Sequence, residues 1–113
     1  MFMPGKPQIW YLDLFAGKND HEAVQRAGES GHKEINRTNL STDQITEGLK
    51  KDVVQKQLAL IRMRNTHKAF SEGAEVAISG GERSLEIRWE YNSAFATLYV
   101  NFESGTYTIV ESK

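Results

Sequence analysis

The segment from His32 to Asn39 holds the densest group of side chains able to do chemistry in this 113-residue chain. It reads His-Lys-Glu-Ile-Asn-Arg-Thr-Asn, so hydrogen-bonding groups surround one apolar residue, Ile35. Arg37 offers a fixed fork of donors that suits hydroxyls, carboxylates or phosphate. The segment is therefore a candidate binding site, although a solvated polar loop is the default interpretation of such a composition.

Other kinds of chemistry lack the spacing they need. The three histidines, His21, His32 and His67, never lie three or four residues apart, so we expect no metal site. No Gly-x-Ser-x-Gly elbow frames a nucleophile, and neither glycine-rich stretch has the lysine of a phosphate loop. The absence of cysteine excludes disulfides and thiol catalysis. We expect no cofactor.

Aromatic residues in the second half of the chain offer a further candidate. Four of them could form a sugar-stacking face: Trp89, Phe95, Tyr99 and Tyr107. Because they lie on segments that alternate apolar and polar residues, ordinary core or cross-strand packing is the favoured interpretation.

A buried strand is expected upstream of the candidate segment. The run Gln8-Ile9-Trp10-Tyr11-Leu12-Asp13-Leu14-Phe15 is almost continuously apolar and follows a proline–glycine turn signal. Such a run predicts a strand buried on both faces, which needs parallel neighbours. No second run of this type occurs, so either the strand pairs unusually or its neighbours lie outside this sequence. In βα folds, ligands bind beyond the carboxyl end of such a strand, where residues 32–39 follow.

Helix-capping signals then predict three helices. Asn19, with Glu22, resembles a capping box before a helix over residues 20–27, which Gly28 is suited to end. Ser41 opens a second helix to about residue 50, and Asp52 precedes a third that ends near residue 66 or 67.

From residue 74 the hydrophobic period changes to two. It predicts a four-stranded antiparallel meander with turns at Gly80-Gly81, Asn92-Ser93 and Ser104-Gly105, over residues 75–79, 82–90, 94–102 and 106–111. The fold class is therefore α+β, with the change from helix to strand near residues 70–73.

Composition excludes some partners. The net charge is -1, with 14 basic and 15 acidic residues, so we expect neither nucleic acid nor acidic lipid as a partner. No signal-peptide pattern and no run of roughly 20 apolar residues are present, so we expect a cytoplasmic protein without a membrane span.

Several short motifs occur in an order that resembles a known family. They are Pro4-Gly5-Lys6-Pro7-Gln8-Ile9-Trp10-Tyr11, Ala16-Gly17-Lys18-Asn19-Asp20, Glu34-Ile35-Asn36-Arg37, Val53-Val54-Gln55 and Ile61-Arg62-Met63-Arg64-Asn65-Thr66-His67. Together they resemble the last part of the sucrose phosphorylase group in the α-amylase superfamily, glycoside hydrolase family 13. The stretch 31–39 is closer to glucosylglycerate phosphorylases, since sucrose phosphorylases typically carry Arg-Asp-Ile-Asn-Arg-His-Tyr-Tyr there.

The resemblance implies a fold larger than this chain. Residues 1–70 would be the end of a (β/α)8 barrel, with residues 8–15 as its eighth strand and residues 20–70 as closing helices. Residues 71–113 would be a small four-stranded antiparallel β domain.

The resemblance also implies a reaction. Family members transfer glucose from an α-glucoside to phosphate with retention, through an aspartate nucleophile and a glutamate acid/base. These carboxylates belong to upstream motifs, so the chain holds no catalytic residue and would be inactive alone. Arg37 matches the arginine that holds the donor glucose, and four neighbours would help shape the acceptor or phosphate side: His32, Lys33, Thr38 and Asn39. The alternative is a non-catalytic carbohydrate-binding or assembly module.

An exposed apolar strand invites pairing with another copy of the chain. We therefore expect a homodimer or larger assembly that buries residues 8–15 of each copy. The α-glucoside and phosphate would be partners of the whole enzyme only.

Overall fold

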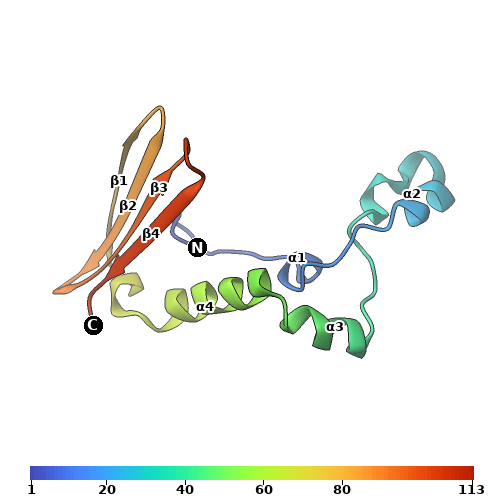
Figure 1. Cartoon of the computed structure of the whole chain (residues 1–113), viewed down its shortest axis with the longest axis horizontal. Helices are drawn as coiled ribbons and strands as arrows, with labels where there is room; N and C mark the ends of the chain where they lie inside the picture. Colours follow the sequence, from blue (N-terminus) through green and yellow to red (C-terminus); the bar gives the residue numbers. More distant parts are fainter. The chain divides into compact units, whose positions relative to one another are not determined.

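A computed structural model describes the backbone of residues 1–113 and every side chain except that of Ser30. Its contacts divide the chain into two compact units. One unit is Gln8–Ala59, and the other combines Met1–Pro7 with Leu60–Lys113. Figure 1 labels the α-helices and β-strands along the chain. The expected division into domains at residues 1–70 and 71–113 stays a prediction.

The unit Gln8–Ala59 is helical. Its elements are α1 (Tyr11–Leu14), α2 (His21–Ala27), the 3₁₀ helix η1 (Gly28–Glu34), α3 (Thr42–Leu49) and the first part of α4 (Asp52–Thr66). The capping box that opens α3 is confirmed, with reciprocal bonds between Ser41 and Gln44. Asp20, rather than Asn19, caps α2 by accepting from the Ala23 amide at 2.8 Å. Gly28 follows α2 with φ +67°, as predicted.

The strand predicted over residues 8–15 is wrong for this chain. The run contains the one-turn helix α1 instead, and only Leu12 in it is fully buried. Ile9, Trp10 and Tyr11 are 36%, 48% and 37% exposed. A strand needs partners for its backbone groups, and no residue described in this unit forms a strand. The backbone therefore bonds locally, as in the Leu14 amide to the Trp10 carbonyl at 3.0 Å.

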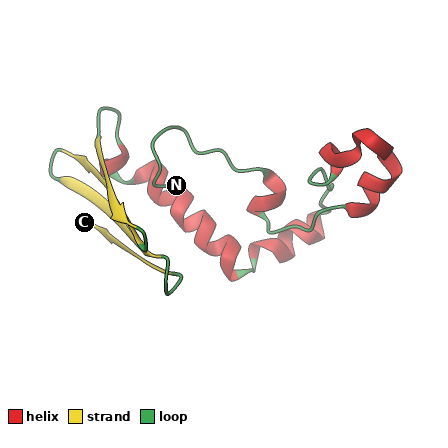
Figure 2. Ribbon diagram, turned by 90° about the horizontal axis from the view of Figure 1, so that it is seen from above, coloured by secondary structure: helices red, strands yellow, loops and turns green.

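The predicted four-stranded meander is confirmed, so the chain has an α+β fold. Its strands are β1 (Glu75–Gly81), β2 (Ser84–Tyr91), β3 (Ala94–Asn101) and β4 (Thr106–Glu111). They pair antiparallel in the order β1-β2-β3-β4, and Figure 2 shows them as one sheet.

One of the three predicted hairpin turns is wrong. Gly80 and Gly81 lie inside β1, and Gly81 pairs with Ser84, so Glu82 and Arg83 make the turn. The backbone of Ser84 lies so close to Gly80 that a side chain at position 80 would collide with it. The glycine thus serves close strand approach rather than the turn. The predicted turns at residues 92–93 and 104–105 are present, with positive φ at Asn92 and Gly105.

One face of the sheet carries the core of this unit. Trp89 lies at its centre, paired with Val76 on β1 and Ala96 on β3. The Trp89 indole nitrogen donates to the Phe2 carbonyl at 2.5 Å, which attaches the first residues to the sheet. The 3₁₀ helix η2 (Lys68–Phe70) adds the buried Ala69. The buried cluster consists of Phe2, Ala69, Ile87, Trp89 and Ala96.

Arg64, near the end of α4, stacks on this core. Its guanidinium lies 4.1 Å from the ring centre of Trp89 and 4.7 Å from that of Phe70. It also donates to the Gly5 carbonyl at 3.1 Å. Burial lowers the pKa of Arg64 from its ordinary value, but an arginine stays charged at neutral pH.

We predict that Trp89→Ala lowers the free energy of unfolding of the sheet unit by about 3 to 5 kcal/mol, because it removes a buried aromatic ring and leaves a cavity. Chemical denaturation followed by circular dichroism measures the change. Tyr107→Ala is the matched control, since Tyr107 is 54% exposed and should cost less than about 1 kcal/mol. Equal losses in the two variants would contradict this core assignment.

Candidate functional site

Two aromatic side chains hold the backbone of the candidate segment. The Trp10 indole nitrogen donates to the Asn36 carbonyl at 2.7 Å, and the Tyr11 hydroxyl donates to the Thr38 carbonyl. The two rings are neighbours, with centres 5.9 Å apart. Residues 36–38 are thus fixed to the start of α1 by donors from consecutive residues.

Two further hydrogen bonds attach the same segment to the chain that follows α1. The Thr38 hydroxyl donates to the Lys18 carbonyl at 3.0 Å. The Asp20 amide donates to the Ile35 carbonyl at 2.8 Å, just before α2 begins. Three of these four bonds use backbone carbonyls of the segment and the fourth uses the Thr38 hydroxyl, so the Arg37 side chain takes no part in holding the segment.

The Arg37 guanidinium faces largely into solvent. It pairs with Glu34 at 3.2 Å, and the two side chains are 57% and 41% exposed. An exposed ion pair of this kind contributes little, typically below about 1 kcal/mol. Arg37 can therefore exchange Glu34 for a ligand oxygen at small cost.

The other predicted site residues surround Arg37 in sequence but make no closed pocket with it. His32 and Lys33 lie on η1 and are exposed, as is Asn39, while Thr38 is half-buried. In the part of the chain that the structure describes, no hydrogen bond or ion pair joins Arg37 to these four residues. The structure thus presents one wall of a site.

A hollow of about 370 Å³ lies beside Thr38 in the same unit. Its other lining residues come from the stretch after α1 and from α3 with the residues beside it: Phe15, Ala16, Gly17, Lys18, Leu40, Gln44, Glu47, Gly48 and Lys51. Lys51 donates to the Ala16 carbonyl at 2.8 Å. Gly48 lets α3 pack directly against Phe15. The sequence did not identify Lys18, Gln44 and Lys51 as residues that line a hollow. The one signal for the hollow was Gly48, a glycine inside a predicted helix.

The proposed aromatic stacking face does not exist as one surface. Trp89 and Tyr107 point to the core side of the sheet, whereas Phe95 and Tyr99 point to the opposite side. Trp89 is 7% exposed and serves the core. Among the residues that the structure describes, no three His, Cys, Asp or Glu side chains gather to hold a metal ion. No helix in that part of the chain could cross a membrane.

Comparison with known proteins now defines the class: the chain resembles glucoside phosphorylases along nearly its whole length. No family model matches it. It is 49% identical over 109 residues to sucrose 6(F)-phosphate phosphorylase of Ilumatobacter coccineus, covering 96% of this chain and 21% of that protein. It is 39% identical to sucrose phosphorylase of Agrobacterium vitis, covering 98% of this chain and 22% of the relative.

Two further matches agree. Glucosylglycerol phosphorylase of Marinobacter adhaerens is 35% identical, covering 98% of this chain and 23% of the relative. The crystal structure of sucrose 6F-phosphate phosphorylase from Thermoanaerobacter thermosaccharolyticum superposes with a TM-score of 0.87 at 35% identity, over 99% of this chain and 22% of that one. The chain is therefore sucrose phosphorylase-like, matches the C-terminal part of such enzymes, and spans about a fifth of their length.

We predict that Trp10→Phe loosens residues 36–38, because the variant keeps a ring but removes the donor to the Asn36 carbonyl. Losing one such bond should speed exchange of the Arg37 amide by about fivefold to tenfold. Hydrogen exchange followed by NMR measures this. Ile9→Val, at a neighbouring and comparably exposed position, is the control. Unchanged exchange at Arg37 would show that the Trp10 bond does not hold the segment.

Proposed function

We propose that this chain forms the C-terminal part of a retaining α-glucosyl-transferring phosphorylase. The whole enzyme converts an α-glucoside and phosphate to α-glucose 1-phosphate and a free acceptor. The observation that carries the proposal is the continuous similarity to such phosphorylases over 96% of the chain. The segment with Ile35, Asn36 and Arg37, which matches the family's sugar-binding motif, supports it because its backbone is fixed and its guanidinium is free to engage a ligand.

In this proposal Arg37 binds the donor glucose. A guanidinium donates several N–H groups in a fixed plane, which suits two neighbouring sugar hydroxyls. Its weak pairing with Glu34 is replaced by these bonds when glucose enters. Trp10 and Tyr11 act as positioning residues, since their bonds to the Asn36 and Thr38 carbonyls fix the loop that carries Arg37.

The nucleophile and the acid/base come from the upstream part of the whole enzyme, so the chain alone is inactive. Residues 8–15 become the eighth strand of the barrel when neighbouring strands supply partners for their backbone groups. On this account residues 1–70 complete the barrel, residues 71–113 form the β domain, and the enzyme is cytoplasmic. Self-association of the isolated chain through residues 8–15, which form no strand here, stays a prediction.

The acceptor carries a negative charge in our proposal. Lys33 and Arg37 place two positive side chains within five residues, against the single acidic residue Glu34. We propose glycerate as the acceptor, because residues 31–39 resemble the corresponding stretch of glucosylglycerate phosphorylases. A fructose phosphate is the competing choice, which the relative from I. coccineus favours by its name. Both acceptors present an anion that Lys33 can bind.

A hybrid enzyme tests the function directly. We predict that the I. coccineus relative, with its matching segment replaced by this chain, releases glucose 1-phosphate from its glucoside and phosphate. The isolated chain should release no glucose 1-phosphate, because it lacks the nucleophile that forms the covalent glucosyl-enzyme. Arg37→Ala should lower kcat/KM of the hybrid about tenfold to a hundredfold. This is the loss expected when hydrogen bonds from a charged donor to the substrate are removed.

Arg26→Ala is the matched control in that hybrid. Arg26 is a comparably exposed arginine, 66% against 57% for Arg37, and it pairs with Asp20 and Glu22, so its loss should leave kcat/KM unchanged. The proposal fails if the folded hybrid is inactive while the parent enzyme works. It also fails if Arg26→Ala and Arg37→Ala reduce activity alike.

Lys33→Ala tests the acceptor. In the reverse reaction of the hybrid, from glucose 1-phosphate, the variant should raise KM for glycerate or fructose 6-phosphate about tenfold, because a charged contact is lost. KM for uncharged fructose should not change. Steady-state kinetics with the three acceptors measures the difference, and an equal effect on all three would exclude an anion contact at Lys33.

A further inference from the structure

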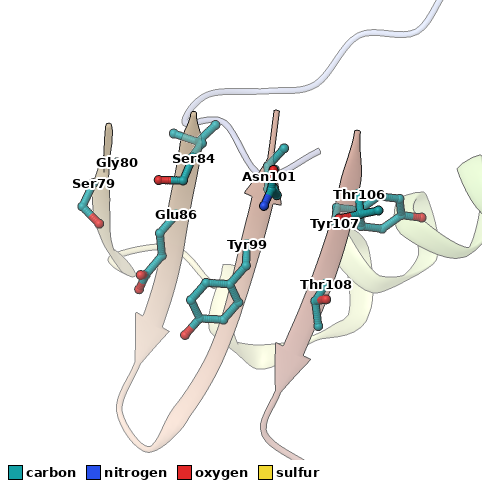
Figure 3. A pocket seen from close by; sticks show the side chains of 11 residues that line it. Ser79, Gly80, Ser84, Glu86, Tyr99, Asn101, Thr106, Tyr107 and Thr108 are labelled. Atoms are coloured by element: carbon teal, nitrogen blue, oxygen red, sulfur yellow. The ribbon is translucent and has the colours of Figure 1, made fainter. Parts of the chain in front are cut away.

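The sheet face opposite the core is hollowed. A depression of about 270 Å³ spans all four strands near the end where β1 turns into β2 (Figure 3). The side chains on this face that line it are polar, apart from one aromatic ring: Ser79, Ser84, Glu86, Tyr99, Asn101, Thr106 and Thr108. Nothing in the proposed reaction uses these residues.

Strand register explains why these side chains converge. Glu86 pairs with Ser79 on β1 and with Tyr99 on β3, and Tyr99 pairs with Thr108 on β4. A second row joins Asn101 to Ser84 and Thr106. Side chains of directly paired residues lie on the same face about 4.5–5.5 Å apart. Residues from four strands therefore meet on one small surface, with Glu86 and Tyr99 at its middle.

Glu86 is a half-buried carboxylate without a cation. The neighbouring cation on this face, Arg88, is engaged by Glu90 at 3.0 Å and Thr97 at 3.2 Å, and it stacks on Phe95. In the described part of the chain Glu86 has no ion pair, and no lysine, arginine or histidine lines the hollow. The hollow therefore accepts hydrogen bonds strongly and disfavours anions.

Tyr99 and Asn101 supply the other contacts that a sugar needs. The Tyr99 ring is 43% exposed beside Glu86, so a ligand can reach it (Figure 3). The side-chain oxygen Oδ1 of Asn101 already accepts hydrogen bonds from the backbone amides of Glu103 and Ser104, at 2.9 and 3.0 Å. Its NH₂ group remains available as a donor. The hollow thus combines a ring, a charged acceptor, an amide donor and several hydroxyls.

We propose that this hollow binds one ring of a neutral sugar, such as an α-glucoside. Glu86 accepts from sugar hydroxyls, Tyr99 packs against the C–H face of the ring, and Asn101 donates to a ring or hydroxyl oxygen. The volume lies just below the roughly 300 Å³ at which small-molecule pockets begin, which suits a single ring. The site goes beyond the proposed phosphorylase reaction, because it concerns the sheet and not the segment that carries Arg37.

Titration of the 113-residue chain with methyl α-glucoside, followed by NMR of backbone amides, tests the proposal. We expect saturable shifts in the millimolar range at residues 84–86, 99–101 and 106–108. Tyr99→Ala should weaken binding about fivefold to tenfold through loss of the ring. Glu86→Gln should weaken it about tenfold through loss of a charged acceptor. Glucose 1-phosphate should bind less tightly than the neutral glucoside.

Matched controls are Phe102→Ala and Glu82→Gln, which remove an exposed ring and an exposed carboxylate outside the hollow and should leave binding unchanged. If Tyr99→Ala unfolds the sheet, the comparison of sugar affinity between Glu86→Gln and Glu82→Gln tests the proposal by itself. The absence of saturable shifts at those amides overturns the proposal. So do equal effects of the two glutamate variants, tighter binding of glucose 1-phosphate, or shifts that follow chain concentration instead of sugar.

The same variants keep this site separate from the phosphorylase proposal. Glu86→Gln should leave phosphorolysis by the hybrid enzyme unchanged, while Arg37→Ala should leave the NMR shifts on the sheet unchanged. An inactive hybrid therefore counts against the phosphorylase proposal alone.

Discussion

The contact of Arg64 with two aromatic rings joins the end of α4 to the core of the sheet unit. Trp89 and Phe70 are neighbouring rings, with centres 5.4 Å apart and planes tilted by 58°, and both lie against the guanidinium. Trp89 also donates to the Phe2 carbonyl. The end of α4, the first residues and the centre of β2 thus share one cluster. In the described part of the chain, one buried nitrogen of Arg64 has no hydrogen-bond partner. Burying a donor without a hydrogen-bond partner destabilises the fold. The cation–π attraction of the guanidinium to two rings, about 1–2 kcal/mol when partly desolvated, offsets this destabilisation.

In the helical unit, two consecutive aromatic residues hold a backbone segment in place instead of forming a core. Trp10 and Tyr11 remain well exposed, yet their polar ends fix the backbone around Arg37. Aromatic residues with a donor suit this use, because the ring packs while the N–H or O–H binds. The result is one fixed wall with an exposed arginine, in a chain that spans about a fifth of its relatives. We propose that this wall is part of a larger phosphorylase pocket.

Local signals in the sequence predicted most of the elements correctly. The Ser41 capping box and the turns at residues 92–93 and 104–105 depend on neighbours in sequence, and they appear as expected. The strand over residues 8–15 failed because a strand depends on distant partners, which this chain does not contain. The turn at Gly80-Gly81 failed because close approach of Ser84, a contact across strands, sets the role of Gly80.

The candidate site was predictable in part. The position of Arg37 followed from a short motif, but its support did not, since Trp10 and Tyr11 belonged to a run interpreted as buried strand. The aromatic residues do not share one face of the sheet. Strand register places Trp89 in the core and Tyr99 on the opposite face. The alternation of apolar and polar residues showed that the sheet has two different faces. It could not show the strand register, which pairs Glu86 with Ser79 and Tyr99 with Thr108.

The most direct test of the central claim is a crystal structure of the hybrid enzyme with its glucoside bound. The account predicts that the Arg37 guanidinium lies within about 2.7–3.2 Å of a hydroxyl oxygen of the donor glucose, the range of a hydrogen bond. It also predicts that residues 8–15 form a strand paired on both edges. A bound glucose without contact to Arg37, with the guanidinium still paired only to Glu34, would contradict the account.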